Sequence, residues 1–457
     1  MHRESCASVE WPRSITVLMS KMANMPGAAR VRRSWYARTT GFLFSFELPF
    51  AAFLVGGGLE AALIQGGTPF DVTSIGYGLS VFAGIIVIGR HRGRIPRSVL
   101  GPVFAGLTLF AYLVLSATWS PSQAYASDKT IQIGLLVAWS FLAPFLVLSW
   151  NQPRISRLVL SIGVLALLLF ISLPFGIWEG ELISEGYLGM GRLLGAGVIV
   201  ALSTMLDRRK GPGFVVILGA TILGSLGMLL LGGRGPFLSL VFAAGVMVWL
   251  ATSRGSSTTS RIRAGLMVGT LVSTVTAVTV LLTGMASTSF RTLDRLALLI
   301  PGGPSAGMSA NTREGFYSVA LHYWGTAPLI GHGLGSWPIL LGWGDVRLYP
   351  HNIFLEILVE TGIVGLLLFV LLATLALHRF SRAYRGTPQT QQGLLVATMG
   401  LFIFFLFNAS VSGDISDNRP LFAAIALLAC MRPAEPPGRL SRQEGRGSGT
   451  YGGGGVS

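Results

Sequence analysis

Long runs of apolar residues, separated by short polar or glycine-containing breaks, recur along almost the whole chain. Most runs are about 20 residues long, which is the length of an α-helix that crosses a bilayer. Because the hydrocarbon core offers the backbone no water to bond with, each run is expected to be a helix. The pattern predicts about twelve membrane spans, at residues 41–63, 71–89, 98–118, 130–149, 157–175, 193–206, 213–231, 236–251, 264–284, 353–377, 391–411 and 420–432.

Composition agrees with this pattern and excludes an ordinary soluble protein. Hydrophobic residues make up 51% of the 457 residues and charged residues 12%, and the mean hydropathy is +0.63. A soluble domain carries roughly a quarter charged residues. The predicted fold class is therefore all-α, a polytopic bundle of membrane helices.

The distribution of charge gives the expected orientation. The net charge of +15 comes mostly from arginine, and such a basic chain could in principle bind nucleic acid. Here, however, the basic residues cluster in alternate breaks between apolar runs, such as "RHRGRIPR" and "HRFSRAYRG", whereas the intervening breaks are neutral or acidic. Since basic loops stay in the cytoplasm, we expect both termini to be cytoplasmic, membrane lipids to surround the protein, and nucleic acid not to be a partner.

The two ends of the chain differ from the membrane domain predicted at residues 41–432. Residues 1–40 are basic and contain no sustained apolar run, so they are predicted to be a cytoplasmic segment. Residues 433–457 end in "GRGSGTYGGGGVS" and are expected to be a disordered cytoplasmic tail. Cys6 and Cys430 fall on the predicted cytoplasmic side without metal-binding spacing, so a structural disulfide is not expected.

One predicted outer loop, residues 285–351, is much longer than a typical connection, and loops of this length are usually functional or disordered. It contains a predicted helix at about Asn311 to Trp324. Apolar side chains recur along this helix with the spacing of an amphipathic face, at Phe316, Val319, Ala320 and Tyr323. We expect this helix to lie on the membrane surface or to cover a cavity between the spans.

His351 stands at the end of this loop, immediately before an apolar run. Because imidazole has a pKa near 6.5, His351 is a candidate general base outside the membrane. The alternative is an interfacial histidine at a helix start, with Asn352 serving as the helix cap. His322 and His332 are expected to be structural.

The apolar run itself contains two glycines and two acids. Gly362 would lie roughly 16 Å below the helix start, near the middle of the bilayer, and Gly362 and Gly365 would let a neighbouring helix approach closely. Glu356 and Glu360 share one helix face. Because an acid inside a span is costly, both should face the protein interior, where they would pair with a buried partner or orient the histidine.

Several arginines fall on the predicted outer side, against the usual charge bias. Arg234 stands alone in "LLLGGRGPFLSL", and Arg192, Arg313 and Arg347 lie in other outer segments. A guanidinium group binds phosphate through two parallel hydrogen bonds, so these residues are candidates for a phosphate or diphosphate site. The alternative is contact with lipid headgroups or pairing with Asp414 and Asp417.

Motifs for nucleotide and metal chemistry are absent from the sequence. It contains no GxxxxGK[ST] loop, no HExxH, and no DxD-like pair in a setting that would hold a metal-bound nucleotide sugar. We therefore expect neither a metal nor another cofactor.

At "HNIFLEILVETGIVG" the chain resembles the O-antigen ligase and Wzy-type polymerase superfamily of bacterial surface-glycan enzymes. His351 and Asn352, nine further residues, Gly362 and Gly365 match the ligase signature of that superfamily. Three more segments are similar to those of the superfamily: "GGRGPFLSL", "TREGFYSVALHYWGTAPLIGHGLGSW" and "LSATWSPSQ". The residue before the arginine is usually serine there and is Gly233 here.

The resemblance implies a donor glycan carried on undecaprenyl diphosphate at the periplasmic face of the bacterial inner (plasma) membrane. His351 would activate the acceptor hydroxyl, and Arg234 and Arg313 would bind the diphosphate. We take Asn352, Arg192 and Arg347 as further candidate substrate contacts. The reaction would invert the anomeric centre without a metal.

The resemblance leaves the acceptor open. A polymerase joins lipid-linked repeat units of an exopolysaccharide or O-antigen, whereas a ligase transfers the finished chain to lipid A core. We favour a polymerase because nothing in the sequence indicates a protein-acceptor domain, and polysaccharide export or chain-length-control proteins are then candidate partners. A flippase for lipid-linked oligosaccharides is the alternative of another class, although no internal repeat supports it.

Overall fold

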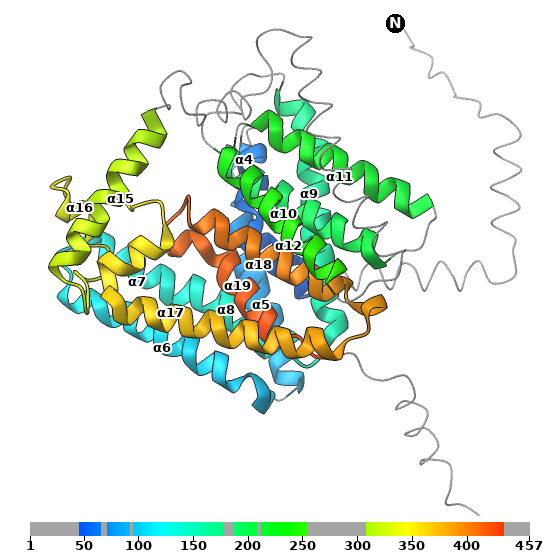
Figure 1. The fold of residues 1–457 in the computed structure, drawn as a ribbon, viewed down its shortest axis with the longest axis horizontal. Helices are drawn as coiled ribbons and strands as arrows, with labels where there is room; N and C mark the ends of the chain where they lie inside the picture. Colours follow the sequence, from blue (N-terminus) through cyan, green and yellow to red (C-terminus); the bar gives the residue numbers. More distant parts are fainter. Residues whose placement is uncertain are drawn as a thin grey trace, which may run out of the picture.

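A computed structural model describes residues 45–64, 71–91, 95–177, 186–207, 212–231, 233–253 and 308–433. The described residues form helices and loops, without a β-strand. The helices, which Figure 1 shows in sequence colours, are α3 Glu47–Val55, α4 Gly57–Ile64, α5 Val72–His91, α6 Leu100–Ser116, α7 Ala124–Gln132, α8 Ala138–Ala143, α9 Gln152–Ile177, α10 Tyr187–Asp207, α11 Pro212–Leu231, α12 Arg234–Thr252, α15 Met308–Thr326, α16 Trp337–Leu340, α17 Ile353–Gly386, α18 Gly393–Ala409 and α19 Arg419–Cys430.

Seven helical segments of the described chain are long and apolar enough to cross a membrane, and the prediction of a polytopic all-α membrane protein is confirmed. Two shorter apolar segments lie at Ile217–Leu229 and Gly393–Ala409. Within the predicted span 41–63, the described residues form two short helices, α3 and α4, which meet at Gly56. The predicted span 264–284, the N-terminal segment 1–40 and nearly all of the tail lie outside the described residues.

The fourth predicted span begins earlier than its hydropathy indicated. Instead of starting at residue 130, the helix starts at Ala124 and continues through two π-helical segments, Ile133–Val137 and Pro144–Leu148. The carboxylate of Asp345 accepts hydrogen bonds from the backbone N–H groups of Gln123, Ala124 and Tyr125, at 2.7–3.1 Å. This helix start therefore receives its acceptor from a residue more than 200 positions away, which the local sequence does not reveal.

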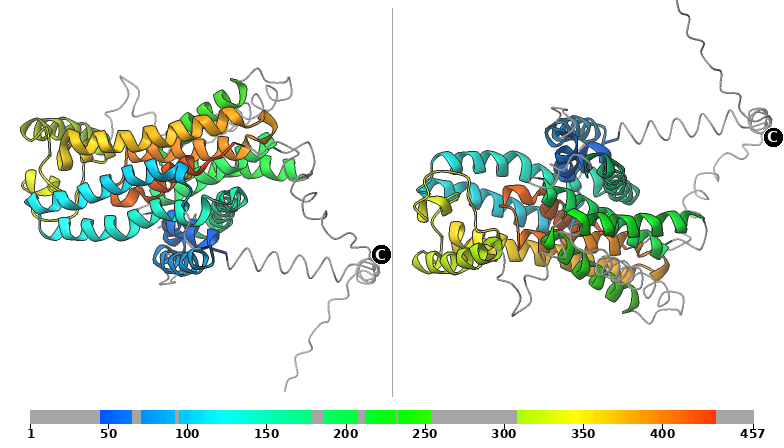
Figure 2. Two further views of the ribbon diagram at one scale, coloured as in Figure 1. Left: turned by 90° about the horizontal axis from the view of Figure 1, so that it is seen from below. Right: turned by 90° about the horizontal axis from the view of Figure 1, so that it is seen from above.

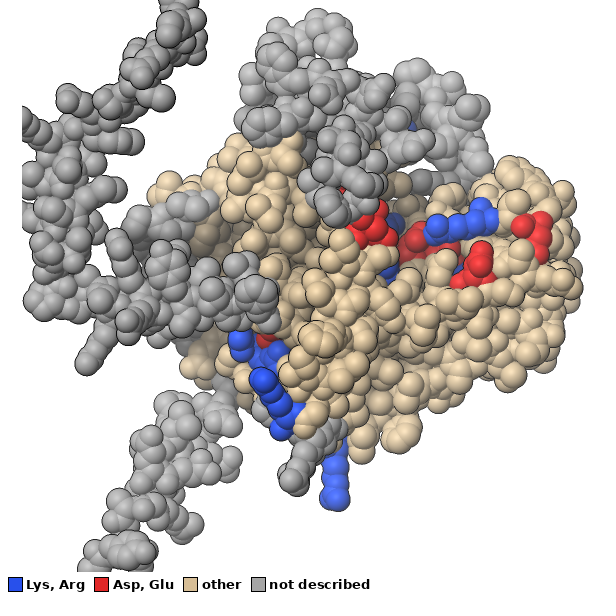
Figure 3. Space-filling view, turned by 180° about the vertical axis from the view of Figure 1, so that it is seen from behind, with Lys and Arg blue, Asp and Glu red and all other residues tan. Residues whose placement is uncertain are grey.

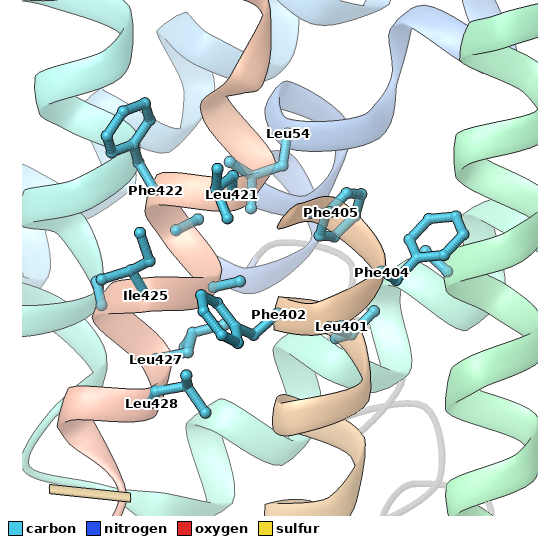
Figure 4. Close-up of a cluster of buried hydrophobic side chains, with 14 of the residues drawn as sticks. Leu54, Leu401, Phe402, Phe404, Phe405, Leu421, Phe422, Ile425, Leu427 and Leu428 are labelled. Carbon is cyan, nitrogen blue, oxygen red and sulfur yellow. The ribbon is translucent and has the colours of Figure 1, made fainter. Parts of the chain in front are cut away.

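The centre of the molecule is built around α18 and α19. Figure 4 shows Phe402 of α18 beside Leu427 of α19, and Leu54 of α3 near Leu421 of α19. Long helices surround this pair: α10 and α12 pack on α18, and α17 packs on α6 and α19. Figure 1 and the left view of Figure 2 show α6 and α17 running side by side, with α15 and α16 at one end.

The outer surface of several helices is apolar. Large hydrophobic side chains are exposed along them, including Phe82 of α5, Phe104 of α6, Leu168 of α9 and Leu367 of α17. Such a surface is unusual for a soluble protein and suits contact with lipid. Figure 3 shows acidic and basic side chains intermixed in one area of the surface and mostly basic side chains at the lower edge, with a broad uncharged region between them.

Candidate active site

The loop at residues 410–418, between α18 and α19, lies at the centre of a group of charged and polar side chains. The Arg192 guanidinium donates to the carbonyl of Ser412 at 3.2 Å. Arg347 donates to Asp417 at 2.7 Å and to Asp414 at 3.4 Å. Two of the four arginines predicted as substrate or phosphate contacts, Arg192 and Arg347, are thus brought together by one short loop.

Arg192 keeps part of its hydrogen-bonding capacity unused. Its Nε is buried and has no hydrogen-bond partner among the described residues. A buried N–H group without a partner is costly unless a ligand or water satisfies it. Arg192 is therefore well placed to bind an anion beside loop 410–418.

Arg234 is the first residue of α12, and the glycines beside it allow close packing. A Cβ at Gly235 would lie 3.1 Å from Val411, and one at Gly191 would lie 3.2 Å from Pro236. The start of α12 therefore lies against loop 410–418 and the first turns of α10, which carry Arg192. Arg234 and Arg192 therefore lie at neighbouring helix starts, both beside loop 410–418.

Arg313 lies in the first half of α15, but its side chain is outside the described part of the structure. The predicted loop helix itself is confirmed and is slightly longer than expected. Its apolar face, at Phe316, Val319, Ala320 and Tyr323, packs against residues of α16, α17 and the loop between them. The helix therefore covers the start of α17.

Arg347 forms ion pairs with Asp414 and Asp417, which match the alternative reading of the sequence. Although burial opposes the charge, these two acids raise the pKa of Arg347 above its ordinary value. Burial likewise opposes ionisation of Asp414, but Lys129 and Arg347 hold the pKa of its carboxyl below the usual value. The Arg347 pairs thus fix the position of loop 410–418.

His351 has a left-handed backbone conformation, with φ at 59°. This region is uncommon for residues other than glycine and recurs at functional sites. The His351 ring lies parallel to Phe316 of α15, with centroids 6.4 Å apart, and edge-on to Tyr349 at 4.6 Å. Two aromatic rings and a strained backbone therefore orient the imidazole.

Asn352 caps α17, as the alternative reading of the sequence supposed. Its side-chain oxygen accepts from the backbone N–H groups of Phe354 at 3.0 Å and Leu355 at 3.3 Å. This cap fixes where α17 begins and therefore where the preceding histidine stands. A direct substrate contact by Asn352 stays a prediction.

Tyr349 connects the histidine to the charged group and was missed in the sequence. Its ring lies 5.9 Å from the Arg347 guanidinium and beside His351. Burial and the nearby Asp417 and Asp414 raise the pKa of Tyr349 to about 12, so the phenol stays protonated. No sequence signal distinguished Tyr349 from other loop aromatics.

Glu356 and Glu360 pair with Lys129 of α7, and all three side chains are buried. Lys129 Nζ lies 2.7 Å from Glu360 Oε1 and also contacts Glu356. Glu356 accepts a further hydrogen bond, at 3.2 Å, from the backbone N–H of Ile415. The expectation of a buried partner is confirmed, but that partner is a lysine that the sequence placed in a loop.

Gly362 breaks α17 instead of packing against another helix. Its φ of 64° and ψ of −163° are not helical and lie in a region that glycine alone readily adopts. A Cβ at Gly362 would overlap the backbone of Leu329 and Ile330. The physical reason for the difference from the prediction is that a loop, not a helix, occupies this space.

Residues 328–333 of the outer loop bind along this break through the backbone. The N–H groups of His332 and Gly333 donate to Val359 and Glu360, each at 2.8 Å, and Ile363 donates to Pro328 at 2.9 Å. These bonds use backbone groups that an unbroken helix would have paired internally. We call residues 328–333 together with the break at Gly362 the clasp.

The clasp also changes the expected depth of Gly362. Tyr112 of α6 donates to the Thr361 carbonyl at 3.2 Å, and Gly333 lies close to the backbone of Ser116 and Ser120, at the end of α6. Gly362 therefore lies beside the end of α6 and the outer loop, not midway along a span. Gly365 accommodates Thr361 of its own helix.

The remaining predicted residues have structural contacts or lie apart. His332 Nε2 is 2.9 Å from the Tyr323 carbonyl and 3.0 Å from Thr326 Oγ1, in agreement with a structural role. His322 is edge-on to Tyr323. Within the described ranges no group of three or more His, Cys, Asp or Glu side chains is arranged to hold a metal ion.

Comparison with known families adds to this geometry. Residues 219–370 match the family described as O-antigen ligase. This segment of the chain is similar to O-antigen ligases. The match covers Arg234, α15, the clasp and His351, and it confirms the superfamily predicted from the signature. No curated protein matches the chain.

This similarity, in a polytopic helical protein, supports a membrane glycan enzyme of the ligase and polymerase type. The matched segment ends within α17. Lys129, Arg192 and loop 410–418, which complete the site, therefore lie outside it.

Proposed function

We propose that the protein is a polymerase that joins undecaprenyl-diphosphate-linked oligosaccharide repeat units during exopolysaccharide or O-antigen synthesis. The enzyme would be a multi-pass protein of the bacterial inner membrane, with both termini in the cytoplasm and its active site facing the periplasm. The observation that carries the proposal is that His351 contacts Tyr349, which lies beside Arg347, while Arg347 and Arg192 both contact loop 410–418. His351 and Arg347 lie in the segment that is similar to O-antigen ligases.

In the proposed reaction His351 accepts the proton of the acceptor sugar hydroxyl. The resulting oxygen nucleophile forms a bond to the anomeric carbon of the donor from the face opposite the diphosphate. The bond between that carbon and the diphosphate oxygen breaks, and undecaprenyl diphosphate leaves with the electron pair. The configuration of the anomeric carbon is inverted.

Arginines would stabilise the charge that develops on the departing diphosphate. Arg234 at the start of α12 and Arg192 in the first turns of α10 both lie beside loop 410–418. The unpartnered Nε of Arg192 supports a role in anion binding. Arg313 would join them from α15. Arg347 would act mainly through Asp414 and Asp417, by holding loop 410–418 in place.

Ligation is the second candidate, because the family that matches residues 219–370 is described as O-antigen ligase. A ligase would use the same donor chemistry but would transfer a finished chain to lipid A core. The glycans of a deletion strain distinguish the two. Single repeat units on the final acceptor support the polymerase, whereas full-length chains that remain on undecaprenyl diphosphate support the ligase.

The catalytic assignment is tested by His351→Ala, with His322→Ala as a matched control on the exposed side of α15. We expect His351→Ala to lower polymer synthesis by at least about 100-fold, since a positioned base contributes roughly that much or more. The His322 variant should make polymer of normal length. Normal polymer from His351→Ala would reject the assignment and favour a transporter whose chemistry lies elsewhere.

A further inference from the structure

Trp343 is an exposed aromatic side chain on the loop that follows α16. Its side chain is 61% exposed, and it stands between Gly342 and Gly344, both with positive φ values, 72° and 84°. Figure 1 shows α15 and α16 together at one end of the molecule. An exposed aromatic ring beside a candidate active site is a candidate ligand contact, because such sites are lined by aromatic side chains.

The backbone that carries Trp343 is anchored, although the ring is exposed. The Trp343 N–H donates to the Pro338 carbonyl at 3.0 Å. Two residues further on, Asp345 accepts from Ser122 Oγ at 2.6 Å and from three backbone N–H groups at the start of α7. These hydrogen bonds, with that from Ser122 the largest cause, lower the pKa of Asp345 to about 2, so the anchor stays ionised near neutral pH.

Phe316 of α15 connects Trp343 to the histidine. It is edge-on to Trp343 at 6.4 Å and parallel to His351, also at 6.4 Å. Two successive distances of 6.4 Å place the Trp343 ring no more than about 13 Å from the imidazole. A short oligosaccharide that is bound at His351 can span this distance.

We propose that Trp343 is a stacking platform for a sugar ring of the glycan substrate, one of the rings next to the sugar that reacts at His351. The inference rests on the proposed function, because it takes the ligand at His351 to be a glycan. The apolar C–H face of a pyranose packs on an aromatic face, and aromatic side chains with nearby polar groups are typical of small-molecule sites.

An anchor at the membrane interface is the competing explanation, because tryptophan is enriched there. The loop around Trp343 argues against it, since Asp345 and the half-exposed Arg347 follow within four residues. Trp249 of α12 provides the contrast. It is 65% exposed on a face shared with Leu238 and Phe242, which are exposed too, as expected of a side chain in contact with lipid.

The test compares Trp343→Ala, Trp343→Phe and Trp249→Ala in detergent-purified protein. The probe is the free repeat-unit oligosaccharide released from the native polymer, and its affinity is measured by calorimetry. We expect Trp343→Ala to raise the Kd about tenfold and Trp343→Phe to raise it much less, because phenylalanine keeps an aromatic face. Trp249→Ala should leave the Kd unchanged.

Polymer analysis in cells completes the test. Trp343→Ala should shorten the glycan chains while the protein keeps its normal thermal stability. An unchanged Kd with unchanged chain length overturns the stacking platform, and so does a variant that only lowers the amount of protein in the membrane. Failure of the proposed function would appear in a different experiment: the His351→Ala variant would then make normal polymer, whatever the result for the Trp343 variants.

Discussion

At the scale of residues, the buried group of Lys129, Glu356 and Glu360 joins three parts of the site. It links α7 to α17 and, through the Ile415 N–H, to loop 410–418. Transferring charges out of water is costly, and only close pairing compensates for it. Removal of one partner is therefore much more damaging than replacement of the whole group.

We predict that Lys129→Met lowers the free energy of unfolding by about 3–5 kcal/mol, because two carboxylates are left buried without a counter-ion. Thermal unfolding of the detergent-purified protein measures the loss. The triple variant with Glu356→Gln and Glu360→Gln carries no buried charge at these positions and should recover part of the stability. Wild-type stability of the single variant would show that the group is dispensable.

The sequence indicated some site residues and could not indicate others. His351, Arg192 and Arg234 stood out because titratable or cationic groups are unusual at the predicted outer ends of membrane spans. Lys129 did not, since its partners lie more than 220 positions away and its apparent loop is a helix. Tyr349 was missed because its role arises from the folded contacts with Arg347 and His351.

At the scale of elements, the clasp shows why the outer loop needs Gly362. Hydrogen bonds from residues 328–333 replace bonds within α17, and the same loop follows α15, whose Phe316 lies on His351. The break in α17 therefore positions α15, and through it the ring that orients the histidine. Hydropathy predicted the helix, but a continuous apolar run carries no signal for such a break.

We predict that Gly362→Ala lowers stability by about 2 kcal/mol or more, because the backbone conformation is unfavourable for alanine and the new Cβ meets the loop. Gly245→Ala in α12 is the matched control, since a Cβ there meets open space and alanine favours a helix. Thermal unfolding and polymer synthesis are measured for both variants. Equal behaviour of the two would contradict the clasp.

At the scale of the whole molecule, the positions of charge and of the site agree on one orientation. His351, Arg234 and loop 410–418 meet at the start of α12, α17 and α19 and the end of α18. Basic residues instead lie in the last turns of α5 and α17 or just beyond α5 and α12, as in "RHRGR", "HRFSRAYRG" and "SRG". Because basic segments stay in the cytoplasm, the site should face the periplasm.

Cysteine labelling tests this orientation in a variant with Cys6→Ser. Cys430 is buried and should react little. We predict that a membrane-impermeant maleimide labels Val346→Cys in intact cells, because Val346 is 51% exposed on the site loop. Ser253→Cys, exposed at the end of α12, should be labelled only after permeabilisation. The reverse pattern would place His351 in the cytoplasm, where a periplasmic polymerase cannot act, and would reject both the orientation and the proposed function.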